Sequence, residues 1–489
     1  MVALSFVDAG AGRETRVIAT STARSLMALV LARDSRSRSI RASDRYEVDA
    51  MIPVLSAAGM RDADAKAGAL RGSQALIREA GTAVGFEAKQ MLGGCYSKRI
   101  AVIVGPGLNG ADGRVAAAWL NDRGARVDLI EVSRQPVDLV GYDLVIDAGF
   151  GLGCSRAYDA PRVVGSTKVL AVDLVSGVDA DTGVVFGAPF QADVTLAIGA
   201  LKYAHITGDA ANLMGELRFV SLDIVGSSED GLVEDSDLAG FIKGDRKDHK
   251  WTHAVSALCG SSLMPGAAEL VSRGAIAGGA SMVRLSSRGD VAARVQLPPE
   301  IVHERDEFVD PRVKSIVAGP GLGVGAAPWL IERLSGVRVP VVLDADGLSL
   351  EVLEHKGDAE WIATPHEGEF ERLTGQPAPA DRVQAVRSLA KSLGCVVLLK
   401  GPITLVCNER GALRAINSGT SALATAGSGD VLAGLIAGAI SRGHDAMSAG
   451  ALSAHLHGRA GQLLAPYAGS SGLFVPLRDL LRSIDAKHC

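Results

Sequence analysis

The chain has 489 residues, so its length predicts two or three domains rather than a single core. A net charge of −5 and only 4% aromatic residues argue against a nucleic-acid-binding surface, and no apolar run has the length of a membrane span. The six cysteines form no C-x-x-C pair, so we expect no structural zinc and a reducing, cytoplasmic compartment.

Residues 1–50 differ in composition from the rest of the chain. They are rich in arginine, serine and threonine and poor in acids, as in an organelle transit peptide or in translated upstream sequence. Met51 opens a segment that reads as a natural start. We therefore expect residues 1–50 to be a poorly ordered extension or the result of a misassigned start, in preference to a working targeting signal.

Residues 51–226 alternate between helical and strand patterns. A helical pattern covers 56–90, and a β-branched run at 99–105 leads through the turn GPGLNGADG (105–113) into a helix over 113–120. Further strands are expected at 126–132, 142–147, 168–174, 193–198 and 217–222. This alternation predicts a Rossmann-like, three-layer α/β domain whose ligands collect at the carboxyl edge of a parallel sheet.

Polar residues gather at that expected edge. The turn matches G-x-G-x-x-G, which is compatible with a dinucleotide-dependent dehydrogenase, but a proline fills the tight turn and Asn109 and Asp112 crowd the phosphate position. Asp147, Asp173 and Ser176 follow neighbouring strands, and such oxygens suit a hard or monovalent cation. For each residue alone, a capping or turn role is equally compatible with the sequence.

The motifs GPGLNGADG (105–113), VIDAGFGLG (145–153) and AVDLVSGVDADTG (171–183) resemble those of the epimerase half of bifunctional NAD(P)H-hydrate repair enzymes, over residues 51–224. The resemblance implies that Asn109, Asp147 and Ser176 hold potassium and that Asp173 transfers the proton. It also implies a set of residues that contact the hydrate: Asn109, Gly110, Asp112, Gly151, Leu152, Gly153 and onward to Ala157. Leu108 and Ala111 replace the asparagine and glycine usual in the first motif, and Leu174-Val175 replaces Ile-Pro in the third.

The second half begins after a segment without apolar periodicity. GSSEDG (226–231) and the charged run 243–250 mark a linker, which we place at 227–246, between domains at 51–226 and 247–489. Strands are expected at 254–259, 281–285, 340–348 and 396–404, a strand leading into a Gly/Pro turn at 315–323, and a small-residue helix at 267–279. The alternation predicts a mostly parallel sheet with its functional loops along one edge.

The stretch GTSALATAGSGDVLAG (419–434) organises this half. Its glycines allow a tight bend before a helix at 431–440, so backbone amides and the helix dipole point at one anion position. Asp430 stands at that position, where it is suited to steer or deprotonate the hydroxyl that accepts a phosphoryl group, or merely to cap the helix. Asp344 and Glu369 suit Mg²⁺, Lys400 suits a phosphate, and no P-loop motif is present.

The second half resembles the ADP-dependent NAD(P)H-hydrate dehydratases, which have a ribokinase-like fold, over residues 238–481. The resemblance lies in HKW (249–251), MVRLSS (282–287), AGPGLG (318–323), VVLDADGL (341–348), TPHEGEF (364–370), LLKG (398–401) and LATAGSGDVLAG (423–434). It implies that the hydrated nicotinamide touches Ala267, Gly321, His366 and the catalytic Asp430. It implies ADP binding by Lys400, Gly401, Thr404, Thr420, Thr425, Ala426, Gly427, Ser428 and Gly429. One departure is Ser261-Ser262-Leu263 before Met264-Pro265-Gly266, where the family usually has a Gly/Ser-Pro-Gly turn.

Together the resemblances imply a nicotinamide-nucleotide repair enzyme. It would interconvert the R and S forms of hydrated NADH and NADPH and dehydrate the S form with ADP, giving AMP and phosphate. The implied cofactors are K⁺ in the first half and Mg²⁺ with ADP in the second, in a homo-oligomer of four or more chains without nucleic-acid or membrane partners. Two alternatives remain open: a small-alcohol kinase of the same fold, and a first half that is a degenerate binding module because of Leu108 and Ala111.

Overall fold

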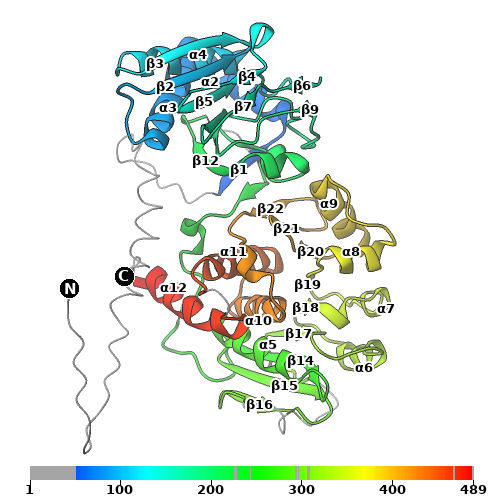
Figure 1. The fold of residues 1–489 in the computed structure, drawn as a ribbon. Helices are drawn as coiled ribbons and strands as arrows, with labels where there is room; N and C mark the ends of the chain where they lie inside the picture. The colour runs from blue at the N-terminus through cyan, green and yellow to red at the C-terminus, as the bar shows by residue number, and fades with distance from the viewer. Residues whose placement is uncertain are drawn as a thin grey trace, which may run out of the picture. The chain divides into compact units, whose positions relative to one another are not determined.

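The computed structural model describes residues 51–224, 228–242, 244–291, 295, 297–304, 309–465 and 468–486. The expectation for residues 1–50 concerns a segment outside these ranges. Two large sheets form the framework, and each is covered by helices (Figure 1). The α/β class expected of both halves is confirmed. No helix among the described residues is long and apolar enough to cross a membrane.

The first half is built on a six-stranded sheet in the order β12-β10-β8-β5-β2-β3, and every neighbouring pair is parallel. Central strands such as β5 are buried along their whole length, which is why the sequence reads there as an unbroken apolar run. The strands lie close to their expected positions: β2 (Arg99–Val104), β3 (Arg126–Glu131), β5 (Leu144–Ala148), β8 (Lys168–Val172), β10 (Val194–Ile198) and β12 (Glu216–Val220).

The helices of the first half differ from expectation in two places. The helical pattern at 56–90 divides into α2 (Ala57–Arg71) and α3 (Ser73–Leu92) at Gly72, whose φ of 86° favours glycine. Helix α4 (Leu108–Asn121) starts well before the expected residue 113. Its early start places Asn109 and Asp112 in the first turns of a helix instead of in a loop.

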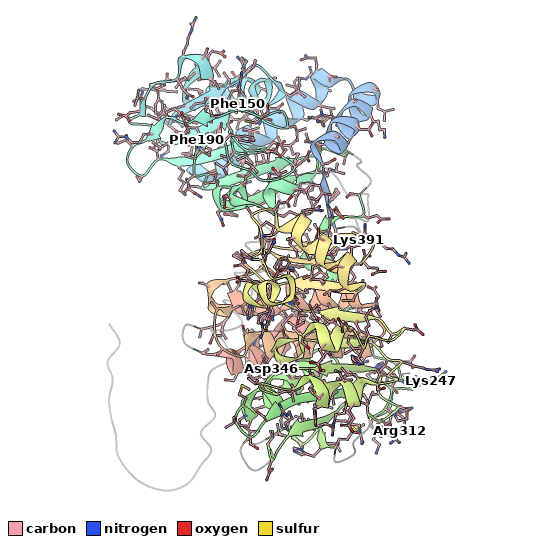
Figure 2. The ribbon with its side chains drawn as sticks, turned by 90° about the vertical axis from the view of Figure 1, so that its right-hand side faces the viewer. Phe150, Phe190, Lys247, Arg312, Asp346 and Lys391 are labelled. Atoms are coloured by element: carbon pink, nitrogen blue, oxygen red, sulfur yellow. The ribbon has the colours of Figure 1, made fainter. Side chains whose placement is uncertain are left out.

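Two short strand pairs and an aromatic cluster support the loop after β5. Strands β4 (Asp138–Leu139) and β7 (Arg162–Val163) pair, as do β6 (Tyr158–Asp159) and β9 (Gly187–Ala188). The ring of Tyr158 lies 5.6 Å from that of Phe150 and 6.4 Å from that of Phe190, centroid to centroid. Figure 2 labels Phe150 and Phe190, which lie near each other in the first half. These contacts hold the loop that carries Phe150 and the glycines behind it.

The second half contains a long sheet in the order β13-β22-β21-β20-β19-β18-β17-β14-β15-β16, which β1 (Ile52–Leu55) and β11 (Leu201–Lys202) extend beyond β13. Its strands are β13 (Gly231–Leu232), β14 (Ala254–Ser261), β15 (Met282–Arg288), β16 (Ile301–His303), β17 (Ser315–Ala318), β18 (Val341–Leu343), β19 (Trp361–Ala363), β20 (Val396–Leu399), β21 (Thr404–Cys407) and β22 (Leu413–Ile416). The strands from β14 to β20 are parallel, whereas β20, β21 and β22 are antiparallel.

The strand expected at 396–404 is wrong in its second part. Strand β20 ends at Leu399, and the chain turns at Lys400–Ile403 before β21 begins at Thr404. Pro402 lies in that turn, where its missing N–H removes a possible ladder bond. Lys400 and Thr404 therefore lie at the two ends of a hairpin turn instead of on one strand.

Helices cover both faces of this sheet (Figure 1). One face carries α5 (Pro265–Ala277), α10 (Ser428–Ser441), α11 (Ala446–Gln462) and α12 (Phe474–Ala486); the other carries α6 (Ala327–Leu334), α7 (Leu350–Leu353), α8 (Glu367–Thr374) and α9 (Arg382–Leu393). Glycines allow α5 and α10 to pack closely. A Cβ on Gly434 would lie 2.1 Å from the Val271 carbonyl oxygen, so a larger residue would clash there. This close packing fixes the position of α10, and with it the turn at its start.

Candidate functional site

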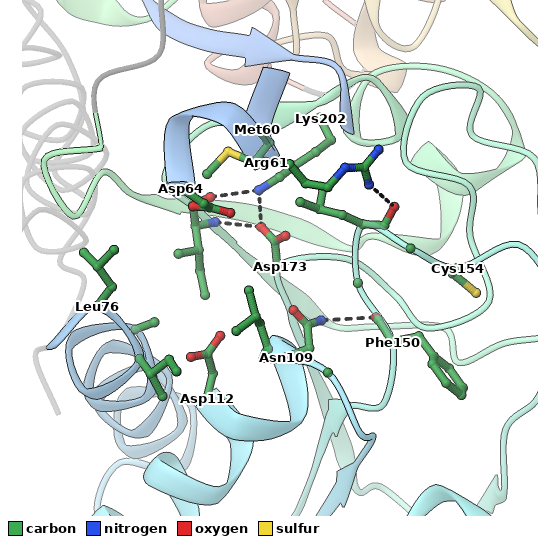
Figure 3. Close-up of a pocket in the computed structure, with 18 of the residues that line it drawn as sticks. Met60, Arg61, Asp64, Leu76, Asn109, Asp112, Phe150, Cys154, Asp173 and Lys202 are labelled. Carbon is green, nitrogen blue, oxygen red and sulfur yellow. Dashed lines mark hydrogen bonds and ion pairs between the residues drawn. The ribbon is translucent and has the colours of Figure 1, made fainter. Parts of the chain in front are cut away.

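The first half contains a cavity of about 840 Å³ at the carboxyl edge of its sheet (Figure 3). Helices α2 and α3, the start of α4, the loop after β5, the turn after β8 and strand β11 supply its walls. The cavity brings together most of the expected substrate residues of this half: Asn109, Asp112, Gly151, Leu152, Gly153 and Asp173. Gly110 lies behind this wall, where a Cβ would come within 1.9 Å of the Gly105 carbonyl oxygen.

Asp173 is held at the cavity wall by a network that the sequence did not reveal. Its backbone has a φ of 64°, a left-handed conformation that is uncommon outside glycine and is often retained at functional sites. Its Oδ1 accepts hydrogen bonds from Lys202 Nζ and, at 3.0 Å, from the Ile198 amide. Lys202 is fully buried and also donates to the carbonyl oxygens of Ile198 at 2.8 Å and Ala200 at 2.9 Å. The lysine therefore anchors Asp173 and compensates its charge.

Asp112 lies in the same cavity in a different situation. Its residue is 8% exposed, and no described residue donates a hydrogen bond to its carboxyl group. Burial raises its pKa to about 8, with a smaller contribution from the negative charges of Asp173 and Asp64. Burial also raises the pKa of Asp64, which comes from α2 and was not expected at the site. The cavity thus collects several carboxyl groups around one buried lysine.

The three side chains expected to hold potassium are linked by hydrogen bonds through Phe150, and Asn109 lines the cavity. Asp147 is fully buried, and burial raises its pKa; its Oδ1 accepts from Ser176 Oγ at 2.6 Å and its Oδ2 accepts from the Ser176 amide at 2.8 Å. Asn109 Nδ2 donates to the carbonyl oxygens of Phe150 at 3.1 Å and Val172 at 2.7 Å. The Phe150 amide donates to Ser176 Oγ at 2.8 Å, which joins the two groups.

This set of atoms fits a monovalent cation. Among the described residues, no group of three or more histidine, cysteine and acidic side chains is arranged to hold a metal. The set at Asn109, Asp147 and Ser176 offers one carboxylate and otherwise neutral oxygens, which matches the low charge of K⁺.

The second half places three charged groups and the glycine-rich turn at one sheet edge, as the sequence predicts. Lys400 Nζ lies 2.7 Å from Asp344 Oδ1 and 3.6 Å from Glu369 Oε2. Burial alone lowers the pKa of Lys400, but the charges of the two acids raise it overall. A Cβ on Gly429 would lie 3.5 Å from Lys400 Nζ and 3.7 Å from Asp344 Oδ2, so the glycine-rich turn lies against this cluster.

The turn itself is built to receive an anion. Gly427, with a φ of 85°, is the N-cap of α10, so Asp430 is not the cap and lies inside the first helical turn. The amides of Gly429 and Asp430 donate to no other described residue. Burial raises the pKa of Asp430 to about 7; the charge of Asp344 adds to this and that of Lys400 opposes it. Open amides, a helix N-terminus and a carboxyl group therefore meet at one point.

Arg382 shapes the turn that follows Lys400. It donates hydrogen bonds to the carbonyl oxygens of Lys400 and Ile403, each at 2.8 Å. A Cβ on Gly401 would lie 2.3 Å from an Arg382 nitrogen, which explains the glycine. Thr404 begins β21 directly after this turn. Nothing in the local sequence marks Arg382, which begins α9 and reaches the turn only in the folded chain.

The remaining residues are those expected to bind ADP and those expected to contact the hydrated ring. Thr420 caps a short 3₁₀ helix that precedes the turn formed by Thr425, Ala426, Gly427 and Ser428. The hydroxyl group of Ser428 donates a hydrogen bond to the Leu423 carbonyl oxygen at 2.7 Å. His366 caps α8 and accepts from the Glu369 amide at 3.2 Å. Ala267 and Gly321 are neighbours, since a Cβ on Gly321 would lie 2.5 Å from that of Ala267.

The two halves match two family models. Residues 73–139 and 130–204 match the family described as YjeF-related protein N-terminus, and residues 255–483 match the family described as NAD(P)H-hydrate dehydratase. The second half is also similar to the solved structure of an ADP/ATP-dependent NAD(P)H-hydrate dehydratase from Bacillus subtilis, with 26% identity and a TM-score of 0.47. That likeness covers 51% of this chain and 97% of the other.

Relatives that span both halves decide the family. A bifunctional NAD(P)H-hydrate repair enzyme from Mycobacterium leprae (strain TN) is 34% identical, over 85% of this chain and 94% of the relative. The enzyme of the same name from Escherichia coli (strain K12) is 30% identical, over 76% of this chain and 82% of the relative. The chain therefore belongs to the family of bifunctional NAD(P)H-hydrate repair enzymes.

Proposed function

We propose that this chain repairs hydrated NADH and NADPH in two steps. The cavity of the first half interconverts the R and S hydrates, and the second half dehydrates the S form with ADP, giving AMP and phosphate. The observation that carries the proposal is the presence of two separate acid clusters, around Lys202 and Lys400, on a chain whose halves match the two families.

In the second step the terminal phosphate of ADP would lie against the free amides of Gly429 and Asp430 and beside Lys400. Asp430 in its ionised form takes the proton from the ring hydroxyl as that oxygen bonds to the terminal phosphorus and AMP leaves. The ring nitrogen's lone pair then expels phosphate and forms a carbon–nitrogen double bond, and loss of a proton from the neighbouring ring carbon to solvent restores the dihydropyridine.

The two expected cations have separate places. Asp344 and Glu369 would hold Mg²⁺, directly or through water, once the nucleotide draws Lys400 away from them. Bound Mg²⁺ neutralises charge on the phosphates. Asn109, Asp147 and Ser176 would hold K⁺, which fixes the loop after β5 against the turn after β8. Ala267, Gly321 and His366 would contact the hydrated ring, with Thr404, Thr420 and Thr425 around the nucleotide.

Two further features complete the proposal. We assign the epimerase to residues 51–226 and the dehydratase to 247–489, in a homo-oligomer of four or more chains whose size light scattering would measure. The described cysteines are all unpaired, which supports a reducing, cytoplasmic compartment.

A phosphate balance separates this function from that of a small-alcohol kinase. The full chain is given the S hydrate, ADP and Mg²⁺, and AMP, free phosphate and nicotinamide absorbance are followed together. We expect the three to appear in equal amounts. A stable phosphorylated product without regained absorbance would favour the kinase instead.

A further inference from the structure

Two carboxyl groups enter the epimerase cavity from different elements. Asp112 comes from the first turns of α4, and Asp173 comes from the turn after β8; both line the cavity, where the carboxyl group of Asp173 is turned toward Lys202 (Figure 3). We propose that Asp112 is a second catalytic group of the epimerisation and delivers a proton to the ring hydroxyl from the side opposite Asp173. This inference rests on the epimerase function proposed above and assigns the path that the reaction takes.

The surroundings of the two groups suit opposite tasks. Oδ1 of Asp173 accepts hydrogen bonds from Lys202 and from the Ile198 amide, which leaves Oδ2 to accept one from a water molecule. Asp112 is 8% exposed and has no donor among the described residues, so its position favours the neutral acid. The carboxyl group of Asp112 lines the ligand cavity and is not held by any of the described residues around it, so it is placed to meet a substrate.

The charges that face Asp112 come from several elements. Besides Asp173, the charged residues of the cavity wall are Arg61, Asp64, Arg156 and Lys202. Burial, with the charges of Asp173 and Asp64, raises the pKa of Asp112 to about 8, so the group keeps its proton at neutral pH. The acid and the base are thus distinguished by their environments, as in other enzymes that use paired carboxyl groups.

The chemistry balances with these two groups and water. Asp112 gives its proton to the ring hydroxyl, the carbon–oxygen bond breaks, and water leaves while the ring nitrogen's lone pair forms a carbon–nitrogen double bond. A second water attacks that carbon from the other face and gives a proton to Asp173, and the π pair returns to nitrogen. One water leaves and one enters, and the roles of the two acids are exchanged in the reverse direction.

The path makes a prediction about oxygen. In water enriched in ¹⁸O, each epimerisation by the full chain exchanges the ring oxygen with solvent, which mass spectrometry of the separated R and S hydrates measures. We expect one labelled oxygen for each inverted centre. Inversion with retention of the original oxygen would show that the ring opens at the carbon–nitrogen bond, and would overturn the proposal.

The variant Asp112→Asn tests the residue itself. Loss of a general acid lowers kcat of epimerisation by about 10²–10⁴-fold. We expect KM to change by less than about fivefold, because the amide keeps the shape and hydrogen-bonding atoms of the side chain. The thermal midpoint stays the same or rises, since the variant removes a buried acid that has no partner. Inactivity caused by unfolding would instead lower the midpoint.

Asp62→Asn is the matched control, because it removes a carboxyl group from α2 that pairs with Lys66 on the surface and does not line the cavity. We expect its epimerisation rate to stay within about twofold of the unmodified chain, far below the range for loss of a general acid. Rates for Asp112→Asn that equal those of Asp62→Asn would overturn the role of Asp112 while the epimerase function stands. An unmodified chain that does not epimerise at all would overturn both, and that outcome is distinguishable from the first.

Discussion

The two sites use the same residue types in different ways. Lys202 is enclosed, with bonds to one carboxylate and two backbone carbonyls, so its role is to hold Asp173. Lys400 contacts two carboxylates, Asp344 and Glu369, and lies against the open amides of a helix start. The partners of a buried lysine therefore indicate its role. A lysine held by backbone carbonyls positions a catalytic acid, whereas a lysine held only by carboxylates beside open amides is free to move to a phosphate.

Each site also contains one acid that its lysine does not contact. Burial raises the pKa of Asp112 to about 8 and that of Asp430 to about 7. The higher value suits an acid that must give a proton near neutral pH, and the lower value suits a base that must take one.

The largest effect is expected for Asp430→Asn. Removing the base that accepts the hydroxyl proton lowers dehydration of the S hydrate by about 10²–10⁴-fold. Binding of ADP, measured by calorimetry, is retained because the amides of the turn are unchanged. Epimerisation in the same molecules serves as the control and keeps its rate. A variant with near-normal dehydration would remove Asp430 from the mechanism.

Lys202→Met tests the role of the buried lysine in the first site. The change leaves the charge of Asp173 buried without its partner, which lowers the free energy of unfolding by about 3–5 kcal/mol and abolishes epimerisation. Urea denaturation measures the loss.

Lys66→Met is the matched control for that experiment, because Lys66 pairs with Asp62 on the surface, where the two side chains are 71% and 63% exposed. An exposed pair of this kind contributes about 0–1 kcal/mol. Equal losses for the two variants would mean that Lys202 is not an anchor.

The pH dependence of dehydration tests whether Asp430 acts as a base. Asp430 must be ionised to act as a base, and burial, followed by the charge of Asp344, raises its pKa to about 7. Activity is therefore full above that pH and falls as the pH drops through it, by about tenfold for each further unit. Initial rates from pH 5.5 to 9 measure this. A flat profile over that range would contradict the role of Asp430 as base.

The smallest effect concerns Leu108, which is 62% exposed on the wall of the first cavity. Leu108→Asn provides a side chain that can form a hydrogen bond with the substrate. One such bond contributes about 0.5–1.5 kcal/mol, so KM for the R hydrate falls by roughly two- to tenfold. An unchanged KM would show that Leu108 does not contact the hydrate.

The sequence predicted all six strands of the first sheet and five parallel strands of the second, because buried parallel strands are continuous apolar runs with polar residues at their carboxyl ends. For the same reason it predicted that Asp344, Glu369, Lys400 and the turn before α10 share one edge, and the structure confirms this. The true N-cap of α10, Gly427, depended on backbone angles that residue types alone do not fix.

The missed residues depend on contacts between distant segments. Asp64 lies in a polar stretch of α2 that resembles any exposed helix face, and Arg382 reaches its turn only after folding. Lys202 had one available signal, a single charge inside an apolar run, which indicates a buried ion pair when the segment is a strand. Recognising that signal would have placed a lysine beside Asp173.

The most direct test of the account is a single time course with both hydrate epimers. The full chain is mixed with an R and S mixture of known composition, ADP, Mg²⁺ and K⁺, and the reduced nicotinamide band is followed beside the variant Asp173→Asn. The account predicts that the unmodified chain converts the whole mixture to reduced nicotinamide, at a rate far above that of spontaneous epimerisation. The variant converts only the S hydrate quickly and then stops. If the unmodified chain also stops at the S fraction, the two halves do not perform consecutive steps.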